Sequence, residues 1–136
     1  MIHHGDTETR SKLLHEELTE KVIGAAIEVH RALGPGLLEP AYEECLCHEL
    51  HLRNIAFQRQ VSLPITYKGV NLDCGYRVDL IVDNEVVLER TCIEHILPVH
   101  EAQLLTYLKL LNKRVGLIMN FHVATLVRGG IVRKIL

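Results

Sequence analysis

The feature that most constrains the fold is a change in hydrophobic period near residue 56. From residue 11 to residue 53, apolar side chains recur every three or four positions, the spacing of amphipathic helices. The stretch "GPG" at 34–36 interrupts this pattern, which predicts one helix over 11–33 and a second over 37–53. Beyond residue 56 the apolar side chains alternate, as in strands. The chain must therefore pack helices against a sheet.

The later elements are predicted from alternation and from proline and glycine positions. "YRVDLIVD" at 76–83 alternates, and "DNE" turns the chain into 86–91, which predicts a β-hairpin. Pro64 marks an edge strand or a bulge in the stretch before it. In chain order the predicted elements after the two helices are a strand in 56–69, the hairpin over 76–91, a helix from Pro98 to about Leu111, a buried strand at 114–121 and a last strand in 129–136. The order α-α-β-β-β-α-β-β predicts an α/β (α+β) fold.

Length and composition narrow the class of protein. The 136 residues suit one domain, and 48% hydrophobic with 24% charged residues is typical of a globular chain. We expect a flexible tail over 1–10, without the apolar segment of a signal peptide, and a domain over 11–136. No apolar run approaches the roughly 20 residues of a membrane helix. The four cysteines form no CxxC pair, so we expect reduced thiols and a cytoplasmic location.

Charge distribution bears on the partner. The formal net charge of −2 argues against a large DNA-coating surface. Residues 102–136 nevertheless carry basic side chains and no Asp or Glu, which permits an anionic partner on one side of the fold. A solvated basic edge explains the same pattern.

Three carboxylates interrupt apolar patterns. Glu89 follows the apolar run Val86–Leu88 and shares a strand face with Thr91, whereas Arg90 points to the other face. Asp79 lies on the partner strand, and Glu39 borders the apolar stripe of the second helix. A shared cation would compensate these charges, and oxygen ligands favour Mg²⁺ or Mn²⁺. The alternative is that Asp79 and Glu89 are solvated on an exposed face of the hairpin, since acidic residues are mostly exposed.

The third predicted helix carries a polar stripe formed by His100, Gln103 and Tyr107 at i, i+3 and i+7. His100 could contact a phosphate or a water of the site. A structural hydrogen bond at the start of the helix is the competing explanation.

Several blocks in order resemble one known family. "GLLEPAY", with Gly36, Glu39 and Tyr42, matches the signature of the GxxExxY proteins. The blocks "LPITYKGVNLDCGYRVDLIVDNEVVLE" and "LPVHEAQLLTYLKLLNKRVGLIMNF" continue the similarity, which covers roughly residues 12–136. That family is placed in the PD-(D/E)xK nuclease superfamily, in its RecB-like branch. The resemblance implies a restriction-endonuclease-like fold, with a central mixed sheet flanked by helices.

The resemblance also implies roles for individual residues. Asp79 and Glu89 correspond to the acidic residues of the PD-(D/E)xK motif, and Glu39 to a helical glutamate that joins the metal site. Gln103 and Tyr107 match the QxxxY helix motif. Thr91 stands where the family commonly has lysine, and a threonine hydroxyl carries no charge.

Two hypotheses follow from these residues. The first is a Mg²⁺- or Mn²⁺-dependent nuclease with metal ligands Glu39, Asp79 and Glu89, whose activity is weak or altered because of Thr91. The second is a catalytically impaired module that binds nucleic acid or a protein partner. Nucleic acid, DNA or RNA, is the expected partner in the first case, and a homodimer is compatible with the sequence.

Overall fold

Two helices precede the sheet, as the change of hydrophobic period predicts. The computed structural model describes residues 15–136, so the predicted tail over 1–10 and the first four positions of the predicted helix over 11–33 lie outside the described residues. The elements are α2 (Glu16–Leu33), α3 (Glu39–Leu52), β1 (Phe57–Ser62), β2 (Ile65–Tyr67), β3 (Val70–Leu72), β4 (Arg77–Val82), β5 (Val86–Thr91), α4 (Pro98–Leu111), β6 (Val115–Asn120) and β7 (Ile131–Ile135).

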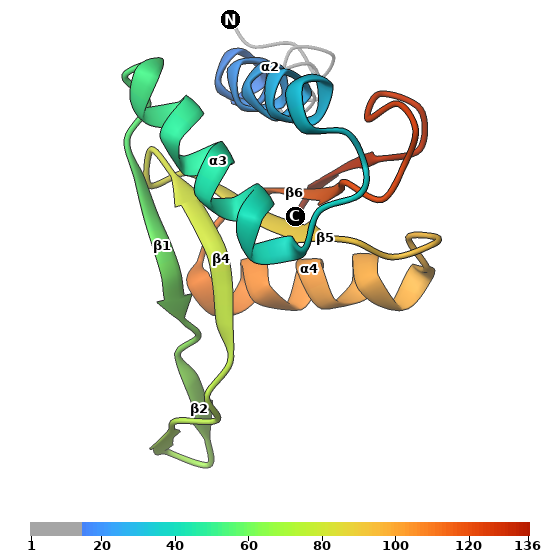
Figure 1. The fold of residues 1–136 in the computed structure, drawn as a ribbon. Coiled ribbons are helices and arrows are strands. Elements are labelled where there is room, and N and C mark those ends of the chain that lie inside the picture. The colour runs from blue at the N-terminus through green and yellow to red at the C-terminus, as the bar shows by residue number, and fades with distance from the viewer. Residues whose placement is uncertain (1–14) are drawn as a thin grey trace, which may run out of the picture.

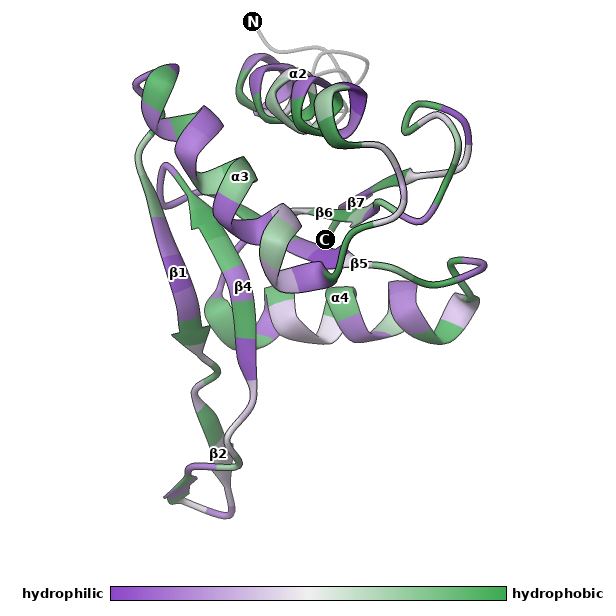
Figure 2. Ribbon diagram, viewed as in Figure 1, coloured by the Kyte–Doolittle hydropathy of each residue, from purple (hydrophilic) through white to green (hydrophobic). Residues whose placement is uncertain are grey.

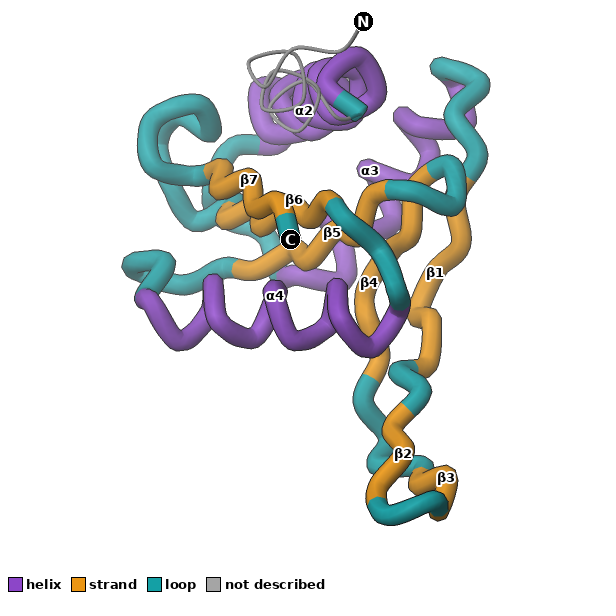
Figure 3. Tube along the Cα trace, turned by 180° about the vertical axis from the view of Figure 1, so that it is seen from behind, coloured by secondary structure: helices purple, strands orange, loops and turns teal. Residues whose placement is uncertain are grey.

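The five-stranded sheet is mixed, with strand order β1-β4-β5-β6-β7. Only β5 and β6 pair in parallel, and α4 connects them. The other neighbours pair antiparallel. Helices α2 and α3 cover one face of the sheet and α4 covers the other, as Figures 1 and 3 show from opposite sides. The predicted α+β fold of the restriction-endonuclease-like type is confirmed.

Each face of the sheet has its own apolar core. Leu80, Val82, Val86, Leu88, Leu117 and Met119 pack with side chains of α2 and α3, among them Tyr42 and Leu46. Val78, Ile81, Val87 and Ile118 pack with Leu104 and Leu108 of α4. The edge strand β1 is more hydrophilic than the neighbouring β4 (Figure 2). Burial on both faces of β4, β5 and β6 holds these strands in place for the site described below.

The predicted strand over 56–69 is divided in two. Leu63 and Pro64 separate β1 from β2, and Pro64 has no N–H to continue a ladder. Lys68 and Gly69, both with positive φ, then turn the chain into β3. The small β2–β3 hairpin projects from the body of the protein (Figure 3). The sequence analysis predicted one strand in this stretch and did not predict β3.

The alternation predicted along 76–83 is wrong at one point. It placed Val78 on the face of Leu80 and Val82, but Val78 packs with Ile81 in the core under α4. The irregularity lies at Asp79. On the neighbouring strand Gln60 has φ 51°, and it does not pair with Asp79, although the residues on either side of it pair with β4. Strand β4 is therefore distorted at Asp79, the aspartate of the predicted motif.

Two further predictions concern features outside the sheet. All four cysteines are free, as the absence of a CxxC pair predicts. Within residues 15–136, no helix has the length and apolar character needed to cross a membrane.

Candidate active site

The β4–β5 ladder stops where Asp79 and Glu89 meet. Regular pairing ends at Leu80 and Leu88. Beyond it, side chains bond the backbone across the gap: the Asp79 N–H donates to Glu89 Oε1 at 3.0 Å, and the Arg90 N–H donates to Asp79 Oδ2 at 2.9 Å. The two carboxylates thus satisfy backbone groups that the missing rungs leave unpaired.

Burial makes this carboxylate pair electrostatically unusual. The Asp79 side chain is 13% exposed, and burial raises its pKa against the opposing effect of the Arg90 N–H. Burial, and then the nearby negative charge of Asp79, raise the pKa of Glu89 to about 8. Both shifts have the direction expected for like charges held together in a poorly solvated place. The explanation that both residues are solvated on an exposed face is therefore wrong.

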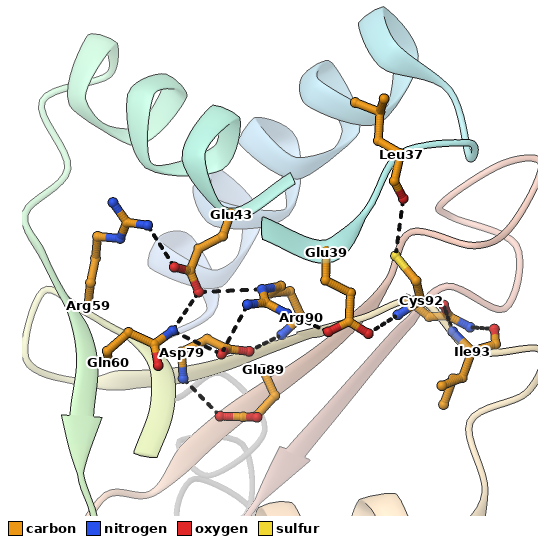
Figure 4. A network of polar contacts seen from close by, with 11 residues as sticks. Leu37, Glu39, Glu43, Arg59, Gln60, Asp79, Glu89, Arg90, Cys92 and Ile93 are labelled. Atoms are coloured by element: carbon orange, nitrogen blue, oxygen red, sulfur yellow. Dashed lines mark hydrogen bonds and ion pairs between the residues drawn. The ribbon is translucent and has the colours of Figure 1, made fainter. Parts of the chain in front are cut away.

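Helix α3 contributes a third carboxylate, but Arg90 holds it. Arg90 Nη1 lies 2.6 Å from Glu39 Oε2, and the Cys92 N–H donates to Glu39 Oε1 at 3.1 Å. The Arg90 side chain extends toward α3, whereas Glu89 extends to the other side of the sheet (Figure 4). The prediction that Arg90 and Glu89 face opposite sides is confirmed.

Three residues of this network, Glu43, Gln60 and Arg59, were missed by the sequence analysis. Glu43 is 4% exposed and lies one turn after Glu39 on α3. Gln60 Nε2 donates to Glu43 Oε1 at 2.8 Å and to Asp79 Oδ1 at 3.3 Å, so it links α3 to β4. Arg59 also pairs with Glu43, at 2.7 Å. The i, i+4 spacing from Glu39 could have identified Glu43, because the two side chains share a helix face.

The other motif residues lie on the opposite face of the sheet, in a pocket under α4. This pocket has a volume of 130 Å³ and is lined by Glu89, Arg90, Thr91, His100, Gln103, Leu104, Tyr107 and Ile118. Glu89 and Thr91 therefore meet the stripe that the sequence predicted on the third helix. The pocket is small but large enough for water, because one water needs only about 10–15 Å³ of such space.

Individual groups in this pocket are already engaged. His100 Nδ1 accepts a hydrogen bond from the Leu97 N–H at 2.8 Å, the structural bond at the helix start that was one of its two predicted roles. Burial, and then the charge of Glu89, raise the pKa of the Tyr107 hydroxyl. That hydroxyl therefore remains protonated and able to donate near neutral pH.

The donor set fits a divalent cation in part. Asp79 and Glu89 are largely buried hard oxygen donors, the kind of ligand that Mg²⁺ and Mn²⁺ prefer. Glu39 does not join them in this arrangement, because Arg90 and the Cys92 N–H take its two oxygens. Within the part of the chain that the structure describes, no three His, Cys, Asp or Glu side chains are grouped to hold a metal ion.

Comparison with known proteins gives one match. A family model described as the PD-(D/E)XK nuclease superfamily matches residues 16–134, nearly the whole chain. Neither the curated proteins nor the solved structures give a match.

Proposed function

Because the chain belongs to the PD-(D/E)XK nuclease superfamily, we propose that it is a metal-dependent nuclease that hydrolyses phosphodiester bonds where β4 and β5 separate. The observation that carries this proposal is the largely buried pair of Asp79 and Glu89, joined by a hydrogen bond of 3.0 Å from the Asp79 N–H to Glu89 Oε1. A scaffold without chemistry has little reason to keep two carboxylates together at a cost in desolvation. The motif residues Glu39, Gln103 and Tyr107 support a place among the GxxExxY proteins and the RecB-like branch.

In this proposal Asp79 and Glu89 hold Mg²⁺ or Mn²⁺. The bound ion would polarise a phosphate oxygen and lower the pKa of a water. The chain's own contribution is to fix the two carboxylates. Asp79 accepts from the Arg90 N–H, and Glu89 accepts from the Asp79 N–H, so neither carboxylate is free to turn away. Glu39 is the third predicted ligand and becomes available when Arg90 leaves it.

The groups under α4 would contact the substrate. Gln103 and Tyr107 border the pocket beside Glu89 and can donate hydrogen bonds to phosphate oxygens. His100 borders it as well, with Nδ1 engaged at the helix start and Nε2 left for a phosphate or water. Thr91 occupies the position where related nucleases commonly have lysine. Its hydroxyl can orient a water but offers no positive charge, so the proposed activity is weak, because such charge stabilisation is often the largest catalytic contribution.

Nucleic acid is the substrate class of this proposal, in a cytoplasmic setting, and a homodimer remains compatible with it. The competing hypothesis is a catalytically impaired module that binds nucleic acid or a protein partner, and Thr91 at the usual lysine position is the observation that favours it.

The test is cleavage of labelled single-stranded DNA, double-stranded DNA and RNA by the full chain with Mg²⁺ or Mn²⁺. We expect slow cleavage that chelation with EDTA stops and that Asp79→Asn abolishes. Glu20→Gln, an exposed carboxylate of α2, is the matched control and should cleave like the wild type. Cleavage that survives Asp79→Asn would place the reaction elsewhere.

A further inference from the structure

Arg90 is a nearly buried cation surrounded by acidic side chains from two elements. Its side chain is 14% exposed. Nη1 lies 2.6 Å from Glu39 Oε2, Nε lies 3.4 Å from Glu43 Oε1, and Nη2 lies 3.9 Å from Asp79 Oδ1. Figure 4 shows the guanidinium between the two glutamates of α3 and Asp79 of β4. Arg90 therefore contacts both Glu39 and Asp79.

These contacts take oxygens that a metal ion would need. Both oxygens of Glu39 are engaged, one by Arg90 and one by the Cys92 N–H. The second oxygen of Asp79, Oδ1, accepts a hydrogen bond from Gln60 Nε2 and lies 3.9 Å from Arg90 Nη2. A guanidinium and a divalent ion drawn to the same carboxylates also repel each other, strongly so where water is scarce. The two cations therefore compete for Glu39 and Asp79.

The guanidinium is incompletely satisfied where it lies. Its Nε is buried and has no hydrogen-bond partner, because the 3.4 Å approach to Glu43 does not have hydrogen-bond geometry. A buried donor without a partner costs free energy, which makes this arrangement easier to leave than a fully bonded one. Glu43 does not depend on Arg90 alone, since Arg59 and Gln60 also contact it.

We infer that Arg90 is an internal cation that occupies the acidic site and competes with the divalent ion, so that metal binding requires its side chain to leave Glu39 and Asp79. This inference rests on the proposed metal site. It also means that Arg90 does not take the place of the missing lysine. The side chain of Arg90 makes its hydrogen bond and ion pairs with Glu39, Glu43 and Asp79, whereas Thr91, at the lysine position, lines the pocket under α4.

The experiment is titration of the full chain with Mn²⁺ alone, followed by the loss of the free-ion paramagnetic resonance signal and by calorimetry. Removal of the competitor in Arg90→Met should tighten Mn²⁺ binding about tenfold. This is the gain expected if about one wild-type molecule in ten has the site open. Arg31→Met, an exposed arginine of α2 paired with Glu28, is the matched control and should leave the affinity unchanged.

Two further variants keep the test decisive. Arg90→Lys retains a charge on a shorter side chain and should tighten Mn²⁺ binding by less than the tenfold expected for Arg90→Met. It replaces Arg90→Met in the test if circular dichroism shows that Arg90→Met is poorly folded. Adding Asp79→Asn to Arg90→Met should remove the gained affinity. Asp79-dependent binding that is unchanged or weaker in both Arg90 variants overturns the inference and leaves the proposed function standing. Absence of Mn²⁺ binding in every variant overturns the metal site and the proposed function with it.

Discussion

The Asp79 N–H donates to Glu89 Oε1 across 3.0 Å at the place where the next rung of the β4–β5 ladder would stand. The Glu89 carboxylate thus accepts the hydrogen bond that a backbone carbonyl would accept in a regular ladder. The bond keeps the Glu89 carboxyl beside Asp79, and burial together with the negative charge of Asp79 raises the pKa of Glu89 in the folded state. This arrangement leads to predictions about stability as well as activity.

Stability should fall as pH rises because of Glu89. Its pKa is about 8 in the folded protein against an ordinary 4.5. Between these values the folded state binds more protons than the unfolded state, so the free energy of unfolding decreases with pH, by up to about 1.4 kcal/mol per pH unit. Glu89→Gln should remove this dependence and be more stable than the wild type at pH 8 by more than at pH 5. Urea denaturation in EDTA measures the free energy of unfolding of the wild type and of Glu89→Gln at each pH. Parallel pH profiles of the two proteins would contradict the raised pKa of Glu89.

Glu43 should be important for stability, although no sequence motif contains it. Its side chain is 5% exposed and pairs with Arg59 and Arg90, so Glu43→Ala removes the buried carboxylate that these two cations share. We expect a loss of about 3 kcal/mol in the free energy of unfolding. Glu44→Ala, which removes an exposed partner of the same Arg59, should cost far less. Equal losses in denaturant melts of the two variants would refute this role.

Thr91→Lys should increase the cleavage rate. The side chain of residue 91 lies in the pocket with Glu89 and Gln103, where a positive charge can offset charge developing on the phosphate. A gain of about tenfold in kcat is a conservative share of what one such group contributes. Thr106→Lys, an exposed position on the same α4, adds the same charge outside the pocket and should have little effect. A gain shared by both variants would indicate non-specific substrate attraction instead.

Gly116 should be required for the position of α4. A Cβ at this residue of β6 would lie 2.7 Å from Leu104 Cδ1, and Leu104 is only 1% exposed. Gly116→Ala should therefore push α4 outward, cost about 1–3 kcal/mol of stability and reduce cleavage by displacing Gln103. Gly36→Ala, where an added Cβ meets nothing within 4 Å, is the control. Thermal melts and cleavage rates that match between the two would show that α4 tolerates the shift.

Local sequence patterns predicted most of the fold because they act within one element. Pro98 and the leucines that follow give a helix that runs from Pro98 to Leu111, as predicted. The hairpin turn, the buried strand β6 and the last strand also follow from alternation and turn residues. The distortion at Asp79 did not follow, because it depends on the positive φ of Gln60 on a neighbouring strand.

The sequence predicted several residues of the site but not how they contact one another. The period of two gave the direction of Arg90, but its partner Glu39 lies 51 positions earlier, and no local pattern reports such a pair. The sequence analysis missed Glu43 because Glu44 follows it directly, and two adjacent glutamates are typical of a solvated stretch of helix. The placement of Thr91 beside Gln103 and Tyr107 depends on how α4 packs on the sheet, again a contact between distant segments.

The most direct test of the central claim is a crystal structure of the protein soaked in saturating Mn²⁺, with anomalous data. We expect an anomalous peak in contact with carboxylate oxygens of both Asp79 and Glu89, with the Arg90 side chain displaced from Glu39. Saturated crystals with no peak between Asp79 and Glu89 would contradict it.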